Sequence, residues 1–413
     1  MKTRSSRLRR GDVQLLYTWL RVLGLATIAH VYLPDYDQAG WLVPRIIGLA
    51  GGVGLILASR HPSSVFHRDY AVFLMMTCLI LASGKVYTLL GLRDVLTQSL
   101  LLLCFYLLGA WGLWRPQQAR SCLRGVVWCA SLTYGLAVLH KLNADFLHTP
   151  QSCAIHGVEI SLSLLDDGEA SGFTHQLIRT LLGWAKHHPT AVASGVLGLE
   201  FSLALLCLRH SRWMWVWGSL FHLPLTLTIA PAFGSVMAAG WGAGTLLGPP
   251  LIRFDRVQTH VTAQPVIWVV CFYGVHGLSP YIGVEFQHSA AMLSNLRVDP
   301  ACANSVVMPR TSYDPYIYID EVRFGSRSLP RREMIVRETL WNLSALHTMR
   351  RNWCIPENQP LTVKGSYARS PLIINNLCAP GALDQLSRDA LFPSGWQRYQ
   401  KNLSRTCHAE CVH

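Results

Sequence analysis

Residues 134–146 read YGLAVLHKLNADF and close a long apolar run. The run is long enough for a membrane-spanning helix, whose last turn would hold His140 and Lys141, with Asn143 and Asp145 directly after it. A lysine or aspartate at the centre of a bilayer helix costs about 3 kcal/mol, and less near the ends. Lys141 could therefore simply extend its charge to the interface beside Asp145. The clustering of a His, a Lys, an amide and a carboxylate favours a functional site as the other interpretation.

Composition places the chain among membrane proteins. Of its 413 residues, 51% are hydrophobic and 14% charged, whereas soluble proteins carry about 25% charged residues. The net charge of +13 would suggest nucleic acid in a soluble protein. Here loop topology accounts for much of it, so we expect a lipid membrane and no nucleic acid as partner. No cleavable signal peptide is expected, because the basic start runs on into further spans without a small-residue cleavage site.

The apolar pattern predicts about nine membrane-spanning helices, each long enough for a bilayer of roughly 30 Å. They cover Val13–Leu33, Leu42–Ser59, Tyr70–Leu90, Thr97–Trp114, Leu123–Lys141, Thr190–Leu208, Trp213–Ala230, Ser235–Ile252 and Pro265 to about Pro280. A long polar insertion over about 142–188 follows the fifth, and a tight turn at 231–234 joins the seventh to the eighth.

Basic residues gather in the loops on one side of this arrangement, which the positive-inside rule makes cytoplasmic. These loops contain Arg4, Arg7, Arg9, Arg10, Arg60, Arg68, Arg115, Arg120, Arg124, Arg209, Arg212, Arg253 and Arg256. The N-terminus is therefore predicted to be cytoplasmic. Lys141, the insertion and the C-terminal region should face the periplasm or lumen of a bacterial inner membrane or an ER-like membrane.

The character of the chain changes near Asp299, which divides it into two predicted parts. Residues 1–298 form the transmembrane part, and 299–413 a small extracytoplasmic region. In that region 313–324 and 361–368 alternate like strands, and 338–353 reads as an amphipathic helix. The predicted fold class is an all-α polytopic membrane protein with a small α+β C-terminal region.

Cysteines concentrate in the C-terminal region: Cys302, Cys354, Cys378, Cys407 and Cys411. In an oxidising compartment we expect some of them to form disulfides, one of them with Cys153 in the insertion. The end of the chain, CHAECVH, could also be a metal-binding tail. One cysteine pair with nearby histidines is weak support, so we favour disulfides and predict no metal site.

Three ionisable residues within predicted spans need explanation. Lys85 in the third span can be neutral or extend to the interface. Glu200 lies among apolar residues in the sixth span, where a carboxyl group must be protonated or paired. His222 in the seventh is either a satisfied core histidine or, beside Lys141 and Glu200, part of a polar cavity.

The stretch 281–297, YIGVEFQHSAAMLSNLR, follows the last predicted span and is half apolar and half polar. It predicts an interfacial or re-entrant helix that could roof a cavity between spans. The sequence contains no Walker A loop, no strand-linked G-x-G-x-x-G, no H-E-x-x-H and no G-x-S-x-G. Nucleotide, metal and serine-hydrolase chemistry thus lack motif support.

Together these stretches resemble the vitamin K-dependent gamma-carboxylase family and its microbial relatives, the HTTM-domain proteins, over about residues 10–300. The 134–146 stretch looks like the family's tyrosine-initiated motif that ends lysine-leucine-(Asp/Asn)-Ala-Asp-aromatic. Phe221-His222, with FGSVMA at 233–238, is similar to its FH segment, and MLSNLR at 292–297 to its signature after the last span. The chain departs from the family at Asn143, often Asp there, and in a tail too short for the family's large propeptide-gripping region.

The resemblance implies that Lys141 is the base that deprotonates a reduced vitamin K or related quinol. With O2 and CO2 as co-substrates, the family carboxylates a glutamate of a peptide or protein and releases the quinone epoxide. Lys141 must be neutral to act, and an apolar cavity favours this form and excludes water. We expect His140 and His222 to join it in catalysis. The residues expected at the cofactor are Asn143, Asp145, Glu200, Tyr281, Asn295 and Arg297.

Two alternatives remain open. One is an oxidase that modifies a peptide or small molecule in the same cavity without fixing CO2. The other is a membrane scaffold or transport-like protein, in which Lys141, Glu200 and His222 form a structural polar network. In that case, removing one charge should cost stability because its partner stays buried and unpaired.

Overall fold

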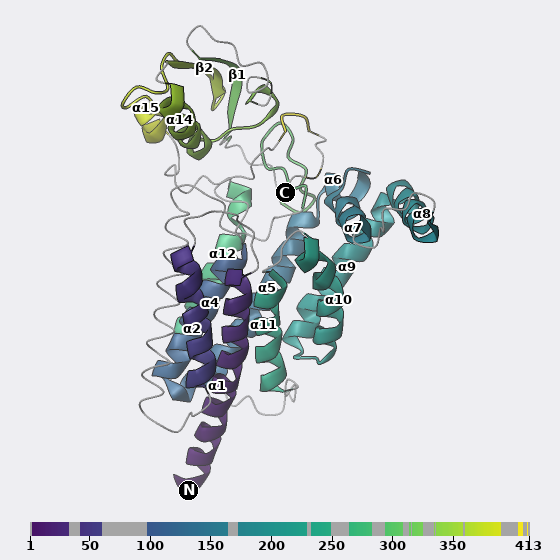
Figure 1. The fold of residues 1–413 in the computed structure, drawn as a ribbon, viewed down its shortest axis with the longest axis vertical. Helices are drawn as coiled ribbons and strands as arrows, with labels where there is room; N and C mark the ends of the chain where they lie inside the picture. The colour runs from purple at the N-terminus through teal and green to yellow at the C-terminus, as the bar shows by residue number, and fades with distance from the viewer. Residues whose placement is uncertain are drawn as a thin grey trace.

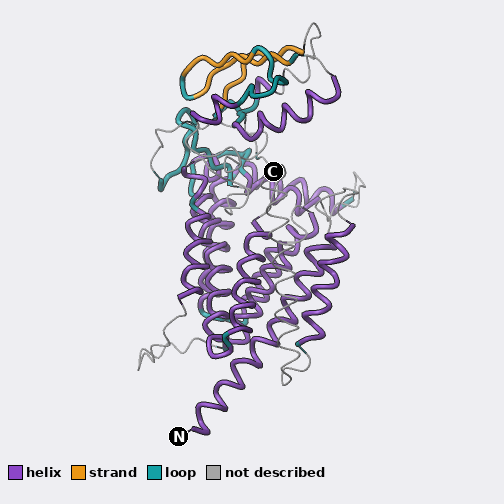
Figure 2. Tube along the Cα trace, turned by 90° about the vertical axis from the view of Figure 1, so that its left-hand side faces the viewer, coloured by secondary structure: helices purple, strands orange, loops and turns teal. Residues whose placement is uncertain are grey.

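The computed structural model describes residues 2–32, 42–59, 97–163, 172–228, 233–248, 264–282, 294–308, 314, 316–324, 334, 336–357, 360–389, 404–407 and 411. The chain is mostly helical, with one small sheet close to its C-terminus (Figures 1 and 2). The N-terminus and the sheet lie at opposite ends of the molecule (Figure 1).

Eight of the predicted apolar segments are helices in the structure. They are α1 (Lys2–Tyr32), α2 (Leu42–Ala58), α4 (Thr97–Trp114), α5 (Ala119–Lys141), α9 (Pro189–Leu208), α10 (Trp213–Thr228), α11 (Phe233–Leu247) and α12 (Gln264–Gly277). The predicted Tyr70–Leu90 span, Lys85 and part of the 231–234 turn lie outside the described residues.

Length and composition make two of the described helical stretches able to cross a membrane, at Pro116–Lys141 and Pro189–Leu208. The first includes the short 3₁₀ turn η2 (Pro116–Gln118) that precedes α5. Several others are apolar but short: α10, α11 and α12 have 16, 15 and 14 residues. The helices thus give weak support for a membrane protein and do not establish nine spans.

Helix α5 is the centre of the bundle and packs against α1, α4, α9, α11 and α12. Small residues bring the helices together: a Cβ at Gly240 of α11 would lie 2.6 Å from the Ala130 Cβ of α5. The indole nitrogen of Trp19 in α1 donates to the Ala239 carbonyl of α11 at 2.9 Å, which uses the buried polar atom of a large core side chain. This packing fixes the face that α5 turns toward α9.

The insertion after α5 is helical, which its polar composition did not predict. It forms α6 (Ala144–His148), α7 (Cys153–Ser163) and α8 (Phe173–His187). Asn143 starts α6 as its N-cap, since its side chain accepts from the Phe146 amide at 2.8 Å. The helices α6–α8 lie at the end of the bundle nearer the sheet (Figure 1).

The C-terminal region contains a three-stranded antiparallel sheet in the order β1 (Ile317–Phe324), β2 (Leu361–Tyr367) and β3 (Ser370–Ile374). Two helices accompany it, α14 (Leu343–Glu357) and α15 (Asp384–Asp389). Side chains such as Ile319, Val363 and Leu346 form its apolar core. Both predicted strands and the predicted helix are present.

Two details of this region differ from the prediction. The β2–β3 hairpin turns at Ala368 and Arg369, with φ of 49° and 66°. Such turns normally show themselves through Asn or Gly, so the sequence carried no sign of β3. The helix also begins at Leu343 and not near 338, because Trp341 pairs with Ile317 through two backbone hydrogen bonds.

Three disulfides join Cys153 to Cys411, Cys302 to Cys407, and Cys354 to Cys378. The expected pairing of C-terminal cysteines is confirmed, including the one with Cys153. Cys407 and Cys411 of the terminal tail form disulfides with different partners. The sequence analysis favoured such disulfides over a metal-binding tail. The predicted helix over 281–297 is described at its ends: Tyr281 lies in the 3₁₀ turn η3 (Ser279–Ile282), and 294–297 is irregular.

Candidate functional site

One face of α5 carries two polar side chains to its neighbours. Tyr134 and Lys141 are seven residues apart, so they lie on the same side of the helix about two turns from each other. Lys141 Nζ donates to Glu200 Oε1 of α9 at 2.6 Å. The Tyr134 hydroxyl is 2.8 Å from His222 Nε2 of α10. The structure therefore pairs Lys141 with Glu200, a partner that the sequence did not assign. Tyr134 joins the site as a residue missing from the predicted set.

The Lys141–Glu200 pair is shielded from solvent, with side-chain exposures of 8% and 5%. The Phe146 ring of α6 covers the ammonium group at 6.0 Å. Among the described residues the second carboxyl oxygen, Glu200 Oε2, is buried without a hydrogen-bond partner. A buried carboxyl oxygen normally has a hydrogen-bond partner, so Glu200 Oε2 can accept a hydrogen bond from a bound polar group.

His222 sits among aromatic rings. Its ring lies 5.0–5.7 Å, centroid to centroid, from those of Phe221, Phe233, Trp241 and Tyr134. Its Nδ1 is buried and has no partner in the part of the chain that the structure describes. This holds for either tautomer, because Nδ1 is an unpaired donor when Tyr134 donates to Nε2 and an unpaired acceptor when it does not.

The two pairs are close enough to interact through charge. Glu200 acts electrostatically on the Tyr134 phenol, and Lys141 on the His222 ring. The three helices α5, α9 and α10 thus hold four polar side chains in one buried group, which we call the Lys141 cluster: Tyr134, Lys141, Glu200 and His222. Two of its polar atoms, Glu200 Oε2 and His222 Nδ1, have no hydrogen-bond partner among the residues that the structure describes.

His140 points elsewhere, because consecutive residues of a helix are about 100° apart. Its Nδ1 lies 3.2 Å from the Tyr281 hydroxyl, which also donates to the Leu139 carbonyl at 3.2 Å. Because the Leu139 carbonyl can only accept, the Tyr281 hydroxyl donates its hydrogen to that carbonyl and accepts a hydrogen bond from His140 Nδ1–H. His140 and Tyr281 therefore form a pair of their own, and the structure does not bring His140 into direct contact with the Lys141 amine.

Asn143 uses its side chain fully within the protein. Its Nδ2 donates to the carbonyls of His140 and Ser294, at 2.8 and 2.5 Å. Its Oδ1 accepts from the Phe146 amide and from Asn304. An amide has two donor hydrogens and two acceptor lone pairs, so all four are used. Asn143 positions the end of α5 against the segment 294–308.

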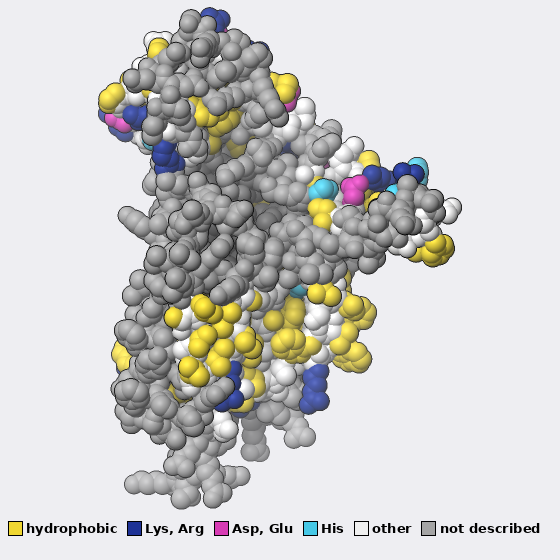
Figure 3. All heavy atoms as spheres, viewed as in Figure 1, with side chains coloured by type: hydrophobic (Ala, Val, Ile, Leu, Met, Phe, Trp, Pro, Cys, Tyr) yellow, Lys and Arg dark blue, Asp and Glu magenta, His cyan; other side chains and the backbone are white. Residues whose placement is uncertain are grey.

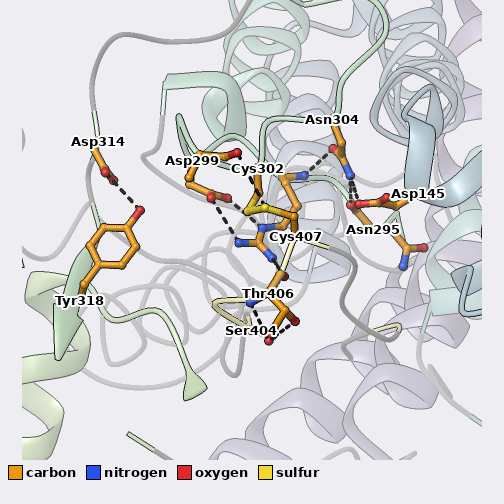
Figure 4. Close-up of a disulfide and its surroundings, with 12 residues drawn as sticks. Asp145, Asn295, Asp299, Cys302, Asn304, Asp314, Tyr318, Ser404, Thr406 and Cys407 are labelled. Atoms are coloured by element: carbon orange, nitrogen blue, oxygen red, sulfur yellow. Dashed lines mark hydrogen bonds and ion pairs between the residues drawn. A yellow bond between two sulfur atoms is a disulfide. The ribbon is translucent and has the colours of Figure 1, made fainter. Parts of the chain in front are cut away.

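Asn304 is a structural residue that the sequence analysis missed. Its Nδ2 lies 2.7 Å from Asp145 Oδ2 and 2.8 Å from the Asn295 carbonyl, and its Oδ1 accepts from the Arg297 amide (Figure 4). With its 3.3 Å contact to Asn143 Oδ1, Asn304 connects four of the predicted cofactor residues. It stands in an ordinary polar stretch, and no local pattern could have marked it.

The remaining predicted residues also have protein partners. Asn295 adopts a positive φ of 54°, and its Oδ1 accepts from the Cys153 amide at 2.7 Å. The Arg297 guanidinium makes a two-pronged pair with Asp299 and donates to the Thr406 carbonyl. These contacts, with the disulfides of Cys153 and Cys302, support the site from one side; a role for Asn295 or Arg297 at a cofactor stays a prediction.

One carboxyl group beside this support has a shifted pKa. Burial raises the pKa of the Asp314 carboxyl, and hydrogen bonds from the Tyr316 amide and the Tyr318 hydroxyl oppose the shift. Figure 4 shows the contact between Tyr318 and Asp314. No three His, Cys, Asp or Glu side chains come together as a metal site in the described ranges. The side chains of the Lys141 cluster can transfer protons and form hydrogen bonds.

No family model, characterised protein or solved structure matches the chain. The fold and site by themselves define a helical bundle whose central helix carries a buried Lys–Glu pair and a buried Tyr–His pair. A small disulfide-bonded α+β region stands beyond one end of the bundle (Figure 1).

Proposed function

We propose that this chain is an integral membrane enzyme that uses a reduced quinone and O2 to modify a peptide or protein, in the manner of the vitamin K-dependent carboxylases. Its spans number about nine, with the N-terminus cytoplasmic and the insertion and C-terminal region on the periplasmic or lumenal side. Large apolar side chains are exposed on α9, α10 and α12, among them Phe201, Leu205, Trp217, Leu220, Phe272 and Val275. Figure 3 shows exposed hydrophobic side chains gathered on the visible face of the bundle. Both observations support a lipid-facing surface.

The observation that carries the proposal concerns two buried atoms of the Lys141 cluster, Glu200 Oε2 and His222 Nδ1, which have no hydrogen-bond partner within the described ranges. Buried ionisable groups inside a membrane bundle mark functional sites by default, and unsatisfied ones need a further partner. A hydroquinone fits these atoms, because its two hydroxyl groups can each donate or accept a hydrogen bond. Its flat ring suits the aromatic surroundings of His222 formed by Phe233 and Trp241.

Lys141 and Glu200 act together as the base. With a proton between the two groups, the pair can accept one more from a bound hydroxyl. If the pair is ionic, Glu200 Oε2 takes the proton; if it is neutral, Lys141 Nζ takes it. Either way the pair gains one positive charge, which stabilises an anion formed beside it. Burial excludes water that would otherwise compete for the proton.

When bound, the reduced quinone supplies with O2 a base strong enough to remove the γ-proton of a glutamate, to which CO2 then adds. The Tyr134 hydroxyl orients the His222 ring through the 2.8 Å contact to Nε2, which keeps Nδ1 directed away from Tyr134. The alternative is that the same site oxidises a peptide or small molecule without CO2 fixation.

The test supplies purified protein in nanodiscs with reduced vitamin K and O2 and measures quinone epoxide. We expect epoxide from the parent chain and its loss in Lys141→Ala and Glu200→Gln. Lys186→Ala is the matched control, because Lys186 is exposed and pairs weakly with Glu159 at 3.5 Å. Labelled bicarbonate with a glutamate-containing peptide separates carboxylation from oxidation. Folded parent protein that forms no epoxide would overturn the proposal.

A further inference from the structure

Helix α8 stands apart from the bundle as an arm (Figure 1). It covers Phe173–His187 and leads through His188 straight into α9, which begins at Pro189. Helix α9 is one of the two described stretches able to cross a membrane. The end of α9 that receives α8 would therefore lie at a membrane surface, and α8 beside it.

One face of α8 is apolar and exposed. Phe173, Leu177, Leu181 and Trp184 are 81%, 44%, 42% and 54% exposed. Their spacings of four, four and three residues put them within about 80° of one another around the helix, which defines the apolar stripe of α8. Ile178 and Ala185 are buried on the flank of this stripe.

The opposite face of α8 is basic. His175, Arg179 and Lys186 fall about 180° from the centre of the apolar stripe, and the helix contains no Asp or Glu. Figure 3 shows the arm with hydrophobic side chains on its lower side and basic ones above. The apolar side of α8 thus faces toward the part of the bundle whose surface carries exposed apolar side chains.

We propose that α8 is an interfacial helix, whose apolar stripe inserts into the outer leaflet of the bilayer that α9 crosses. Its 15 residues form a rod of about 22 Å, enough to lie along the headgroup boundary. The basic polar face strengthens binding to anionic lipids, and Trp184 takes the interfacial position that tryptophan favours. A protein partner is disfavoured, because the stripe lies level with the start of a membrane-spanning helix.

This anchoring sets the depth of the proposed reaction site. Glu200 is eleven residues beyond the first residue of α9, or about 16 Å along the helix. With α8 held at the interface, the carboxyl group lies near the middle of a hydrocarbon core of about 30 Å. The inference rests on α9 crossing the membrane and not on the chemistry of the Lys141 cluster.

The experiment places the photo-crosslinking amino acid p-benzoyl-phenylalanine at single positions of the full chain. The protein is reconstituted in vesicles of phosphatidylcholine and phosphatidylglycerol, illuminated, and analysed for lipid adducts by mass spectrometry. Leu177 tests the apolar stripe, Arg179 is the matched position on the opposite face, and the exposed Phe201 reports on α9 itself. These three positions are exposed, so the bulky side chain leaves the core intact.

We expect lipid adducts at Leu177 and Phe201 and few at Arg179. An adduct at Phe201 with none at Leu177, or a Leu177 adduct to a second protein chain, overturns the inference and leaves the membrane assignment standing. Equal labelling at Leu177 and Arg179 overturns it too, since α8 would then not be oriented. Absence of lipid adducts at both Leu177 and Phe201 overturns the inference together with the membrane assignment of α9.

Discussion

Replacing Lys141 with methionine separates the structural role of the Lys141–Glu200 pair from its chemistry. At an effective dielectric constant of about 20, unit charges attract by about 6 kcal/mol at the 2.6 Å that separates Nζ from Oε1. Desolvation offsets much of this attraction. Removing one partner of a buried pair nevertheless costs about 3–5 kcal/mol, because the other charge is left uncompensated.

We therefore expect Lys141→Met to lose about 3–5 kcal/mol of unfolding free energy, because the Glu200 carboxyl group stays buried after its partner is removed. The size of the loss measures how much of the pair's role is structural.

Unfolding of the purified variant and of the parent protein in detergent measures this loss. The double variant Lys141→Met, Glu200→Gln removes both charges and should regain most of the stability while still forming no quinone epoxide. Two results would refute the reasoning. One is Lys141→Met as stable as the parent, and the other is a double variant no more stable than the single one.

Three further predictions concern the support of the site and the C-terminal region. Asn143→Asp keeps the helix cap but loses the two hydrogen bonds that Nδ2 donates to the His140 and Ser294 carbonyls, and should cost about 2 kcal/mol of unfolding free energy in denaturant titrations. Replacing Cys354 and Cys378 with serine opens a loop of 24 residues and should destabilise the C-terminal region by about 3 kcal/mol, measured by limited proteolysis against denaturant concentration. Burial lowers the pKa of His347 in α14, so the stability of this region should fall as pH drops through about 6.5, where the unfolded chain binds the proton more readily, as near-UV circular dichroism would show.

Each of these has a matched comparison within the chain. Asn143→Ser also caps α6 while losing both amide donors, so it should be destabilised as well, and a fully stable variant would contradict the assigned role. Reducing agent should lower the protease resistance of the parent C-terminal region to that of the double serine variant. His347→Gln should remove the pH dependence near neutrality, and an unchanged profile would assign it to another group.

The sequence predicted the helices of the bundle well, because continuous apolar segments must be buried or face lipid whatever surrounds them. The bounds of α4 agree at both ends, and those of α9 within one residue of the prediction. Strands β1 and β2 were visible through alternation. Strand β3 and the helices α6–α8 were not, since an Ala-Arg turn and a mixed polar insertion carry no periodic or turn signal strong enough to read.

The sequence by itself determined which residues had to be explained. Lys141, Glu200 and His222 are ionisable groups in apolar surroundings, and the cost of burying them made each a site residue before any contact was known. The expected disulfide between Cys153 and a C-terminal cysteine followed from the number of cysteines and from the oxidising compartment predicted for this region.

Only the tertiary structure decided which of these residues contact one another. The orientation of α5 about its axis directs Lys141 toward Glu200 and the adjacent His140 toward Tyr281. Helix packing also makes Asn143 a structural residue, because its side chain contacts Ser294 and Asn304, which lie 151 and 161 residues away in the sequence. Such pairings depend on how whole helices pack, because a hydrogen bond needs atoms within about 3 Å and no local pattern encodes that distance.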